Sequence, residues 1–398
     1  MKATAPRKLT VLQVIPQLHA GGAELGCLQV ADALVAAGHR AIVVSEGGRM
    51  VEALRRAGGE HVTLPVASKN PLAMVLNIGR LARLIRRESV DIVHARSRAP
   101  AWSSYFAARR AGAVFMTTHH ASHEESGALK RLYNSVMVRG AAVIAVSDWV
   151  AGLIRRRYGI PEERIHVIHR SVDPERFDPD AVGAARIQAL AKAWGTGPDD
   201  LVVLLPGRIS RRKGHMILID AVAGLEPDLR RRVRLVFAGD DQPKSAFRDG
   251  LERHIAARGL HAQVTFAGHV SDMPAAYSLA MICVLAMTAP EGFPRVMLEA
   301  QAMGTPVIVA DVGPGREVVR APPQVPTDAA SGLTFPAGDA AALGRCLEQI
   351  LRMPEAKRRA MGARGSEWVR STFTLKRLTE ATLALYGNLA ARQGRLLT

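Results

Sequence analysis

Short apolar runs rich in β-branched residues alternate with longer segments of helical periodicity along nearly the whole chain. The runs that we expect to form strands in the first half are 9–15, 41–45, 61–64, 91–94, 114–118, 142–146 and 164–168. Those in the second half are 201–206, 233–238, 263–267, 281–285, 306–310 and 332–335. Strands that alternate with helices form parallel sheets covered by helices on both faces, so the pattern predicts an α/β protein with ligands at the carboxyl ends of its strands.

The chain has a turn-rich stretch near its middle, at 171–180, with the sequence SVDPERFDPD. Its two Asp-Pro steps disfavour a helix, and 398 residues suit two domains. We therefore predict one domain over 1–178 and a second over 179–372. The segment 354–392 is typical of two helices interrupted near 371–374, which leaves 373–398 as a final helix.

The net charge of +17 is spread over both halves of the chain, with an excess of 9 positive charges in 1–180 and 8 in 181–398. A basic surface attracts phosphates, anionic lipid or nucleic acid, and charge alone does not choose among them. A nucleic-acid-binding protein would have clustered charge and stacking aromatic residues, whereas aromatic residues make up only 5% here. We therefore expect no nucleic-acid partner.

The cysteine and hydropathy patterns indicate a cytoplasmic protein. Cys27, Cys283 and Cys346 lie far apart and match no zinc or disulfide spacing, which favours a reducing compartment. The longest apolar run, 279–287, has nine residues, about half of the ~18 that a membrane helix needs. Any membrane contact would therefore be at the surface, on the inner face of the cytoplasmic membrane.

Segment 72–87 is amphipathic, with Arg80, Arg83 and Arg87 on one face. Such a helix either lies on an anionic membrane or packs its apolar side inward and solvates its arginines. Three further arginines at 155–157 favour the membrane-bound alternative.

Three motifs have residues suited to binding phosphates or sugar hydroxyls. Gly21-Gly22-Ala23-Glu24 opens a helix after the first strand, and free N–H groups at a helix N-terminus favour a phosphate. Gly207-Arg208 and Lys213-Gly214 follow strand 201–206, where two cations beside glycines suit a diphosphate. The alternative for the first motif is an ordinary strand–helix turn, and the alternative for the second is a solvated basic loop.

The third motif is the segment 291–299, EGFPRVMLE, in which Glu291 precedes a helix that contains Glu299. Pro294 suits the first turn of this helix and Gly304 its end. The two carboxylates would lie about one helical turn apart near a strand end, where they can accept hydrogen bonds from the vicinal hydroxyls of a ribose or a hexose.

Other polar residues leave their roles open. Asp178-Pro179-Asp180 has the form of a metal-binding D-x-D, but it lies in a turn-rich stretch where Asp-Pro steps are common, and we expect no metal site. His19, His94 and Arg96 could contact a ligand, although a structural role is at least as plausible for the two histidines.

Taken in order along the chain, these motifs resemble glycosyltransferase family 4, whose members have the two-domain GT-B fold. Further matching segments are 93–96, 117–119, 143–147, 172–173 with Phe177, 238–239, 264–268 and 332–333 with Asp339. Segments 94–111 and 133–147 are most similar to bacterial enzymes of lipopolysaccharide or capsule assembly. The resemblance implies two Rossmann-like domains that face each other across a cleft, with the C-terminal helix 373–398 returning to the N-terminal domain.

The resemblance also implies roles for single residues. Arg208 and Lys213 would bind the donor diphosphate, and Glu299 the ribose hydroxyls. Glu291, with the backbone of Gly292 and Phe293, would hold the transferred sugar, and His119 would lie beside its reacting carbon. The remaining donor-binding positions are the glycines Gly21, Gly22, Gly207 and Gly239.

The implied activity is metal-independent transfer of a hexose, with retention of configuration, from a UDP- or GDP-linked donor to a glycan or lipid-linked acceptor, without a cofactor. A sugar-nucleotide epimerase or hydrolase of similar fold is the alternative. The sequence departs from the family pattern at Pro294, where many members have glycine, and at His120, where glycine often follows the histidine. His120 is therefore an alternative to His119. The oligomeric state stays open.

Overall fold

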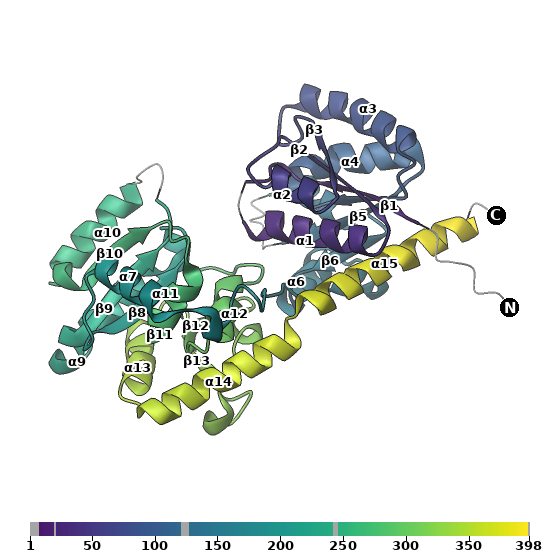
Figure 1. Cartoon of the computed structure of the whole chain (residues 1–398). Helices are drawn as coiled ribbons and strands as arrows, with labels where there is room; N and C mark the ends of the chain where they lie inside the picture. The colour runs from purple at the N-terminus through teal and green to yellow at the C-terminus, as the bar shows by residue number, and fades with distance from the viewer. Residues whose placement is uncertain (1–7, 20, 121–126, 242–245, 397–398) are drawn as a thin grey trace. The chain divides into compact units, whose positions relative to one another are not determined.

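The structure is a computed structural model that describes residues 8–19, 21–120, 127–241 and 246–396. The chain forms two compact units (Figure 1). Unit 1 comprises Met1–Arg170 with Leu375–Thr398, and unit 2 comprises Ser171–Thr374. Residues 171–178 therefore belong to unit 2, although the turn signals placed them at the end of the first domain. The N–H of Val172 donates to the carbonyl of Phe373 (3.0 Å), and the ring of Phe177 lies 6.1 Å from that of Tyr277.

Unit 1 is a seven-stranded parallel sheet with the strand order β3-β2-β1-β4-β5-β6-β7. Its strands are β1 (Thr10–Val14), β2 (Arg40–Ser45), β3 (Glu60–Thr63), β4 (Ile92–Ala95), β5 (Val114–His119), β6 (Ala142–Ala145) and β7 (Ile165–Val167). Its α-helices are α1 (Gly22–Ala36), α2 (Val51–Arg56), α3 (Pro71–Arg87), α4 (Arg98–Ala111), α5 (Ala128–Asn134), α6 (Asp148–Tyr158) and α15 (Leu375–Leu396).

The strands of unit 1 bury side chains on both faces, which is why they read as apolar runs. Alternate residues of β1 enter different cores: Val11 packs with α1 and α15, whereas Leu12 packs with α3 and α4. Helices α1 and α15 lie over one face of the sheet and α3 and α4 over the other (Figure 1).

The C-terminal helix α15 is built into the core of unit 1. Leu385 and Tyr386 are buried against α1, and the hydroxyl of Tyr386 lies 2.6 Å from Nδ1 of His94. Nε2 of His94 lies 2.7 Å from the hydroxyl of Thr118 on β5. Burial, with a smaller effect from the charge of Arg96, holds the pKa of His94 well below its ordinary value, so the imidazole is neutral. His94 therefore has the structural role that was one of its two alternatives.

Unit 2 is a six-stranded parallel sheet with the order β10-β9-β8-β11-β12-β13. Its strands are β8 (Leu201–Pro206), β9 (Val233–Ala238), β10 (Val264–Gly268), β11 (Ile282–Leu285), β12 (Val307–Asp311) and β13 (Gly332–Pro336). Its α-helices are α7 (Ala184–Trp194), α8 (His215–Ala223), α9 (Pro227–Arg232), α10 (Ala246–Ala257), α11 (Met273–Leu279), α12 (Arg295–Ala302), α13 (Ala340–Leu351) and α14 (Glu355–Thr372).

The prediction of an α/β protein with two parallel sheets is confirmed, and each observed strand lies within one residue of its expected ends. In both sheets the strand order reverses beside the first strand: between β1 and β4 in unit 1, and between β8 and β11 in unit 2. Ligands of open α/β sheets bind at such switch points, outside the carboxyl ends of the strands. The fold therefore provides one candidate ligand site in each unit.

Candidate active site

In unit 2, the first loop at the switch point follows β8 and depends on two glycines. Gly207 turns the chain with a φ of 129°, and its N–H donates to the carbonyl of Ala238 (2.8 Å). A Cβ at Gly239 would lie 2.1 Å from the carbonyl oxygen of Gly207. The ends of β8 and β9 can therefore approach this closely only because both positions lack a side chain.

Two cations extend from this loop. Arg208 is exposed, and within the described residues its guanidinium makes no ion pair. Lys213 ends the 3-10 turn η4 (Arg211–Lys213), immediately before Gly214, the N-cap of α8. Its Nζ lies 2.8 and 3.0 Å from the two carboxylate oxygens of Glu291. The structure thus brings together a lysine and a glutamate that are 78 residues apart in the sequence.

The second loop, after β11, is tied to the first. The N–H of Thr288 donates to the carbonyl of Arg212 (3.0 Å), and the Arg212 guanidinium donates to the carbonyl of Pro290 (2.6 Å). Phe293 is buried, with its ring 5.5 Å from that of Phe373. These contacts fix Glu291 and Gly292 beside Lys213 at the carboxyl end of the sheet.

Glu299 lies on α12, and its carboxylate is oriented by a residue that sequence reasoning missed. The buried hydroxyl of Tyr277 donates to its Oε2 (3.2 Å), and Arg295 lies 3.6 Å from its Oε1. Burial, with a smaller effect from the charge of Glu299, raises the pKa of Tyr277 well above its ordinary value, so the phenol keeps its proton. No local pattern links two residues that are 22 positions apart on different helices.

If Glu299 binds the donor ribose, as the family resemblance implies, replacement of Tyr277 by phenylalanine is expected to weaken donor binding roughly 3- to 10-fold, because Glu299 loses a hydrogen-bond donor worth about 0.5–1.5 kcal/mol. The KM for the donor should rise while kcat changes little, because the Tyr277 hydroxyl is buried and acts through the Glu299 carboxylate. Tyr105→Phe, which removes a hydroxyl in unit 1, is the matched control. An unchanged donor KM for Tyr277→Phe would refute the positioning role.

In unit 1 the switch point holds a cavity of about 250 Å³ at the ends of β1, β4 and β5. Gly21 (φ 151°) is the N-cap of α1, and Gly22 begins the helix. The Glu24 carboxylate lies over Gly21, where a Cβ would be 2.5 Å from its oxygen. This carboxylate lines the cavity and offsets the positive end of α1.

The cavity of unit 1 is also lined by Arg96, Arg98 and His120. A nitrogen of Arg170 lies 2.5 Å from Nδ1 of His120, and because arginine can only donate, this Nδ1 accepts. Burial and the charge of Arg170 hold the pKa of His120 well below its ordinary value. His119 is the buried last residue of β5 and is not among the residues that line this cavity.

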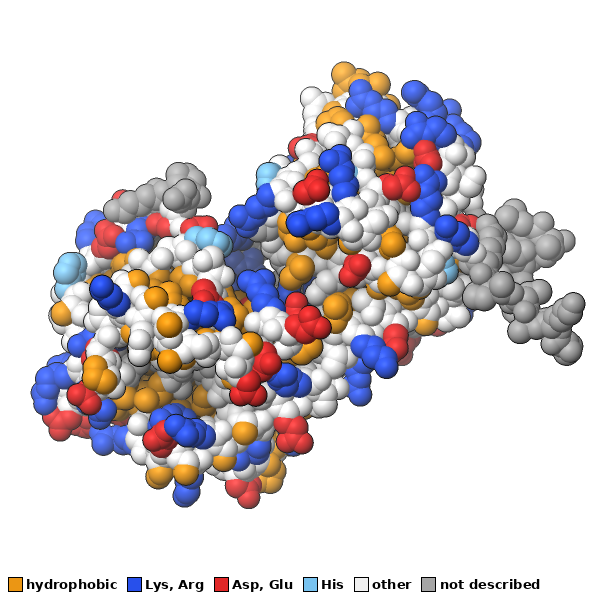
Figure 2. Space-filling model, in the orientation of Figure 1, with side chains coloured by type: hydrophobic (Ala, Val, Ile, Leu, Met, Phe, Trp, Pro, Cys, Tyr) orange, Lys and Arg blue, Asp and Glu red, His pale blue; other side chains and the backbone are white. Residues whose placement is uncertain are grey.

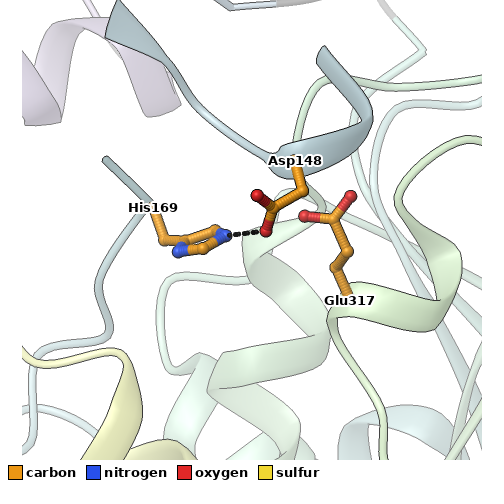
Figure 3. A group of neighbouring side chains, drawn as sticks. All are labelled: Asp148, His169 and Glu317. Carbon is orange, nitrogen blue, oxygen red and sulfur yellow. Dashed lines mark ion pairs between the residues drawn. The ribbon is translucent and has the colours of Figure 1, made fainter. Parts of the chain in front are cut away.

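Two carboxylates outside these loops, Asp148 and Asp178, have partners within their own unit. Oδ2 of Asp148 lies 3.4 Å from Nε2 of His169, both in unit 1 (Figure 3). Glu317, also labelled in that figure, belongs to unit 2. Asp178, from the D-x-D sequence, accepts a hydrogen bond from the N–H of Asp180 and lies 3.4 Å from Arg370. Asp178 thus caps a turn.

Comparison with known proteins matches each unit to a glycosyltransferase family model. The family model described as Glycosyltransferase Family 4 matches residues 20–176, and the model described as Glycosyl transferases group 1 matches residues 187–368. D-inositol 3-phosphate glycosyltransferase of Salinispora tropica is 34% identical over 268 residues, which are 64% of this chain and 52% of that protein. EpsD of Bacillus subtilis is 30% identical over 292 residues, 70% of this chain and 72% of that protein.

Two solved structures share the fold over nearly the whole chain. A glycosyltransferase from Rickettsia africae has a TM-score of 0.85 at 30% identity, covering 96% of this chain and 98% of that one. Anabaena HepE, solved in complex with UDP and glucose, has a TM-score of 0.81 at 20% identity, covering 96% and 100%.

The two parallel α/β units and their loops define a protein of the GT-B glycosyltransferase class. The chain belongs to glycosyltransferase family 4. It spans about half the length of the Salinispora relative.

Proposed function

We propose that the protein transfers a hexose-type sugar from a UDP- or GDP-linked donor to a glycan or lipid-linked acceptor, with retention of configuration and without a metal ion. The carrying observation is the switch point of unit 2, where Lys213 and Glu291 are paired beside Arg208 and the glycine turns. The group combines cations for a diphosphate with carboxylates for sugar and ribose hydroxyls. The ligands of Anabaena HepE, UDP and glucose, carry these same groups: a diphosphate and the hydroxyls of a ribose and a sugar.

In the proposed reaction the bond between C1 of the sugar and the β-phosphate oxygen breaks while C1 bonds to the acceptor oxygen. The proton of the acceptor hydroxyl passes to the departing phosphate. Negative charge grows on that phosphate as the bond breaks, so Arg208 and Lys213 stabilise the transition state more than the ground state. Glu291 and Glu299 hold the sugar and the ribose, and the N-terminus of α8 adds a partial positive charge.

The acceptor binds, in this proposal, in unit 1, whose cavity offers Arg96, Arg98, His120 and Glu24 to polar groups. We place the enzyme at the inner face of a bacterial cytoplasmic membrane, in the synthesis of cell-surface polysaccharide or lipopolysaccharide. The support is the likeness of segments 94–111 and 133–147 to enzymes of that kind. Within the described residues, no helix combines the length and apolarity needed to cross a bilayer.

The stereochemistry of the product tests this proposal. The enzyme is incubated in EDTA with a labelled sugar nucleotide and a lipid-linked glycan extract of bacterial membranes, and the product is analysed by NMR. Retention predicts the same anomer in product and donor. An inverted product would contradict retention, and transfer that requires added Mg²⁺ would contradict the metal-free reaction. Conversion of the donor in the absence of any acceptor would favour the epimerase or hydrolase alternative.

A further inference from the structure

The large hydrophobic side chains that are exposed in the described residues all lie on three helices of unit 1. They are Leu72, Val75 and Leu76 of α3, Phe106 of α4, and Leu129 and Leu132 of α5. Leu129 is 85% exposed and Leu72 69%. A single exposed leucine needs no explanation, but a contiguous patch marks an interaction site.

Helix α3 changes character along its length. Its second half buries Leu81, Leu84 and Ile85 in the core, as an amphipathic surface helix should. Its first half, after the N-cap Asn70, turns Leu72 outward together with Val75 and Leu76. The core of unit 1 therefore does not account for these apolar side chains.

Hydrogen bonds join the three helices into one surface. The hydroxyl of Ser103 on α4 donates to the carbonyl of Met74 on α3 (2.9 Å), and the indole N–H of Trp102 donates to the carbonyl of Tyr133 on α5 (2.9 Å). Between α3 and α4 lies a groove of about 430 Å³, lined by apolar side chains. Its walls are Pro71, Met74, Val75, Ile78, Trp102 and Phe106, and Lys69 stands at its edge.

The charge of this surface has one sign. Segments 68–87, 97–115 and 127–140 contain five, three and three lysines or arginines, respectively, and no aspartate or glutamate. Arg80, Arg83 and Arg139 are exposed, and Arg139 lies over the ring of Trp102 (5.2 Å). In Figure 2, hydrophobic and basic side chains lie together over α3, at the top of the view. Chain-wide basicity alone does not explain segments without any acid.

We infer that the exposed face of α3, α4 and α5 docks on an anionic phospholipid bilayer. Leucines and Phe106 enter the boundary between headgroups and acyl chains, the groove takes up hydrocarbon, and the arginines contact lipid phosphates. Apolar insertion and charge attraction are the two signals that stable surface binding needs. This inference rests on the proposed function only for the reason why the enzyme binds a membrane, which is its lipid-linked acceptor. The exposed apolar and basic side chains do not depend on that function.

Vesicle co-sedimentation of the full chain tests the docking. At low salt the wild type should pellet with vesicles of phosphatidylcholine containing about 30% phosphatidylglycerol and should bind pure phosphatidylcholine far less. Arg80→Gln/Arg83→Gln should weaken partitioning roughly 30-fold, at about 1 kcal/mol for each charge. Leu72→Ser/Leu76→Ser/Leu129→Ser should weaken it at least roughly 10-fold, through lost apolar burial. The double variant Arg352→Gln/Lys357→Gln removes the same charge from exposed positions of unit 2 and should bind like the wild type.

A wild type that stays in the supernatant with anionic vesicles would overturn the inference. So would patch variants that pellet like the wild type, or a unit 2 control that loses as much binding as they do. Thermal stabilisation by the sugar nucleotide is measured on every variant, and it should be unchanged because the patch is confined to unit 1. Lost vesicle binding with intact donor binding therefore separates this inference from the proposed sugar transfer.

Discussion

Replacement of Lys213 by alanine is expected to lower turnover of the donor about 100- to 1000-fold, as removal of one preorganised charge-stabilising group does elsewhere. Lys213 is fixed by its ion pair with Glu291 and stands at the switch point of unit 2, before the N-terminus of α8. In the proposed reaction its removal takes away the cation for the departing phosphate, and it leaves the half-buried Glu291 without that partner. The measurement is the rate of nucleoside diphosphate release at saturating donor.

Arg211→Ala is the matched control for Lys213. Arg211 lies two residues earlier in the same turn, but it is exposed and its guanidinium lies over the ring of Phe247 (5.6 Å). We expect this variant to keep most of its activity. Equal losses in the two variants would mean that general positive charge, rather than the placement of Lys213, drives the reaction.

Replacement of Gly214 by alanine should destabilise unit 2 by about 2 to 5 kcal/mol. The residue has a φ of 75°, where a side chain costs about 1–2 kcal/mol. Its Cβ would also lie 1.6 Å from the carbonyl oxygen of Ala286, a backbone atom that no side-chain rotation can move. Overpacking of this kind adds about 1–3 kcal/mol. Calorimetric unfolding should show a lower transition temperature for unit 2.

Gly195→Ala separates the two contributions. Gly195 has a similar φ of 65° at the end of α7, but a Cβ there meets nothing within 4 Å. It should cost only the backbone term of about 1–2 kcal/mol. If both alanines cost the same, the close approach of Gly214 to Ala286 is not a source of constraint in the protein.

The fold followed from the sequence because buried parallel strands are apolar on both faces and stand out as short β-branched runs. The helix after Glu291 was also predictable: Pro294 is its N-cap, and Gly304, with a φ of 74°, follows its C-terminal end. These signals are local, and the chain carries them within a few residues.

Contacts between distant segments could not be predicted in this way. The Lys213–Glu291 pair joins two loops that are adjacent only because β8 and β11 are neighbours in the sheet. The Tyr277–Glu299 hydrogen bond depends on the packing of α11 and α12. The periodicity of 72–87 indicated an apolar stripe, but only the packing of α4 and α5 decides which half of it stays uncovered.

The ribose- and phosphate-binding roles are tested most directly by thermal stabilisation with a panel of UDP- and GDP-sugars and free nucleotides. The measurement is made in EDTA on the wild type and on Glu299→Ala, starting with UDP-glucose. Our account predicts a shift with one class of donor that survives EDTA and is lost in the variant. A shift that depends on a divalent metal, or that persists in Glu299→Ala, would contradict it. No shift with any nucleotide would contradict the proposed donor site.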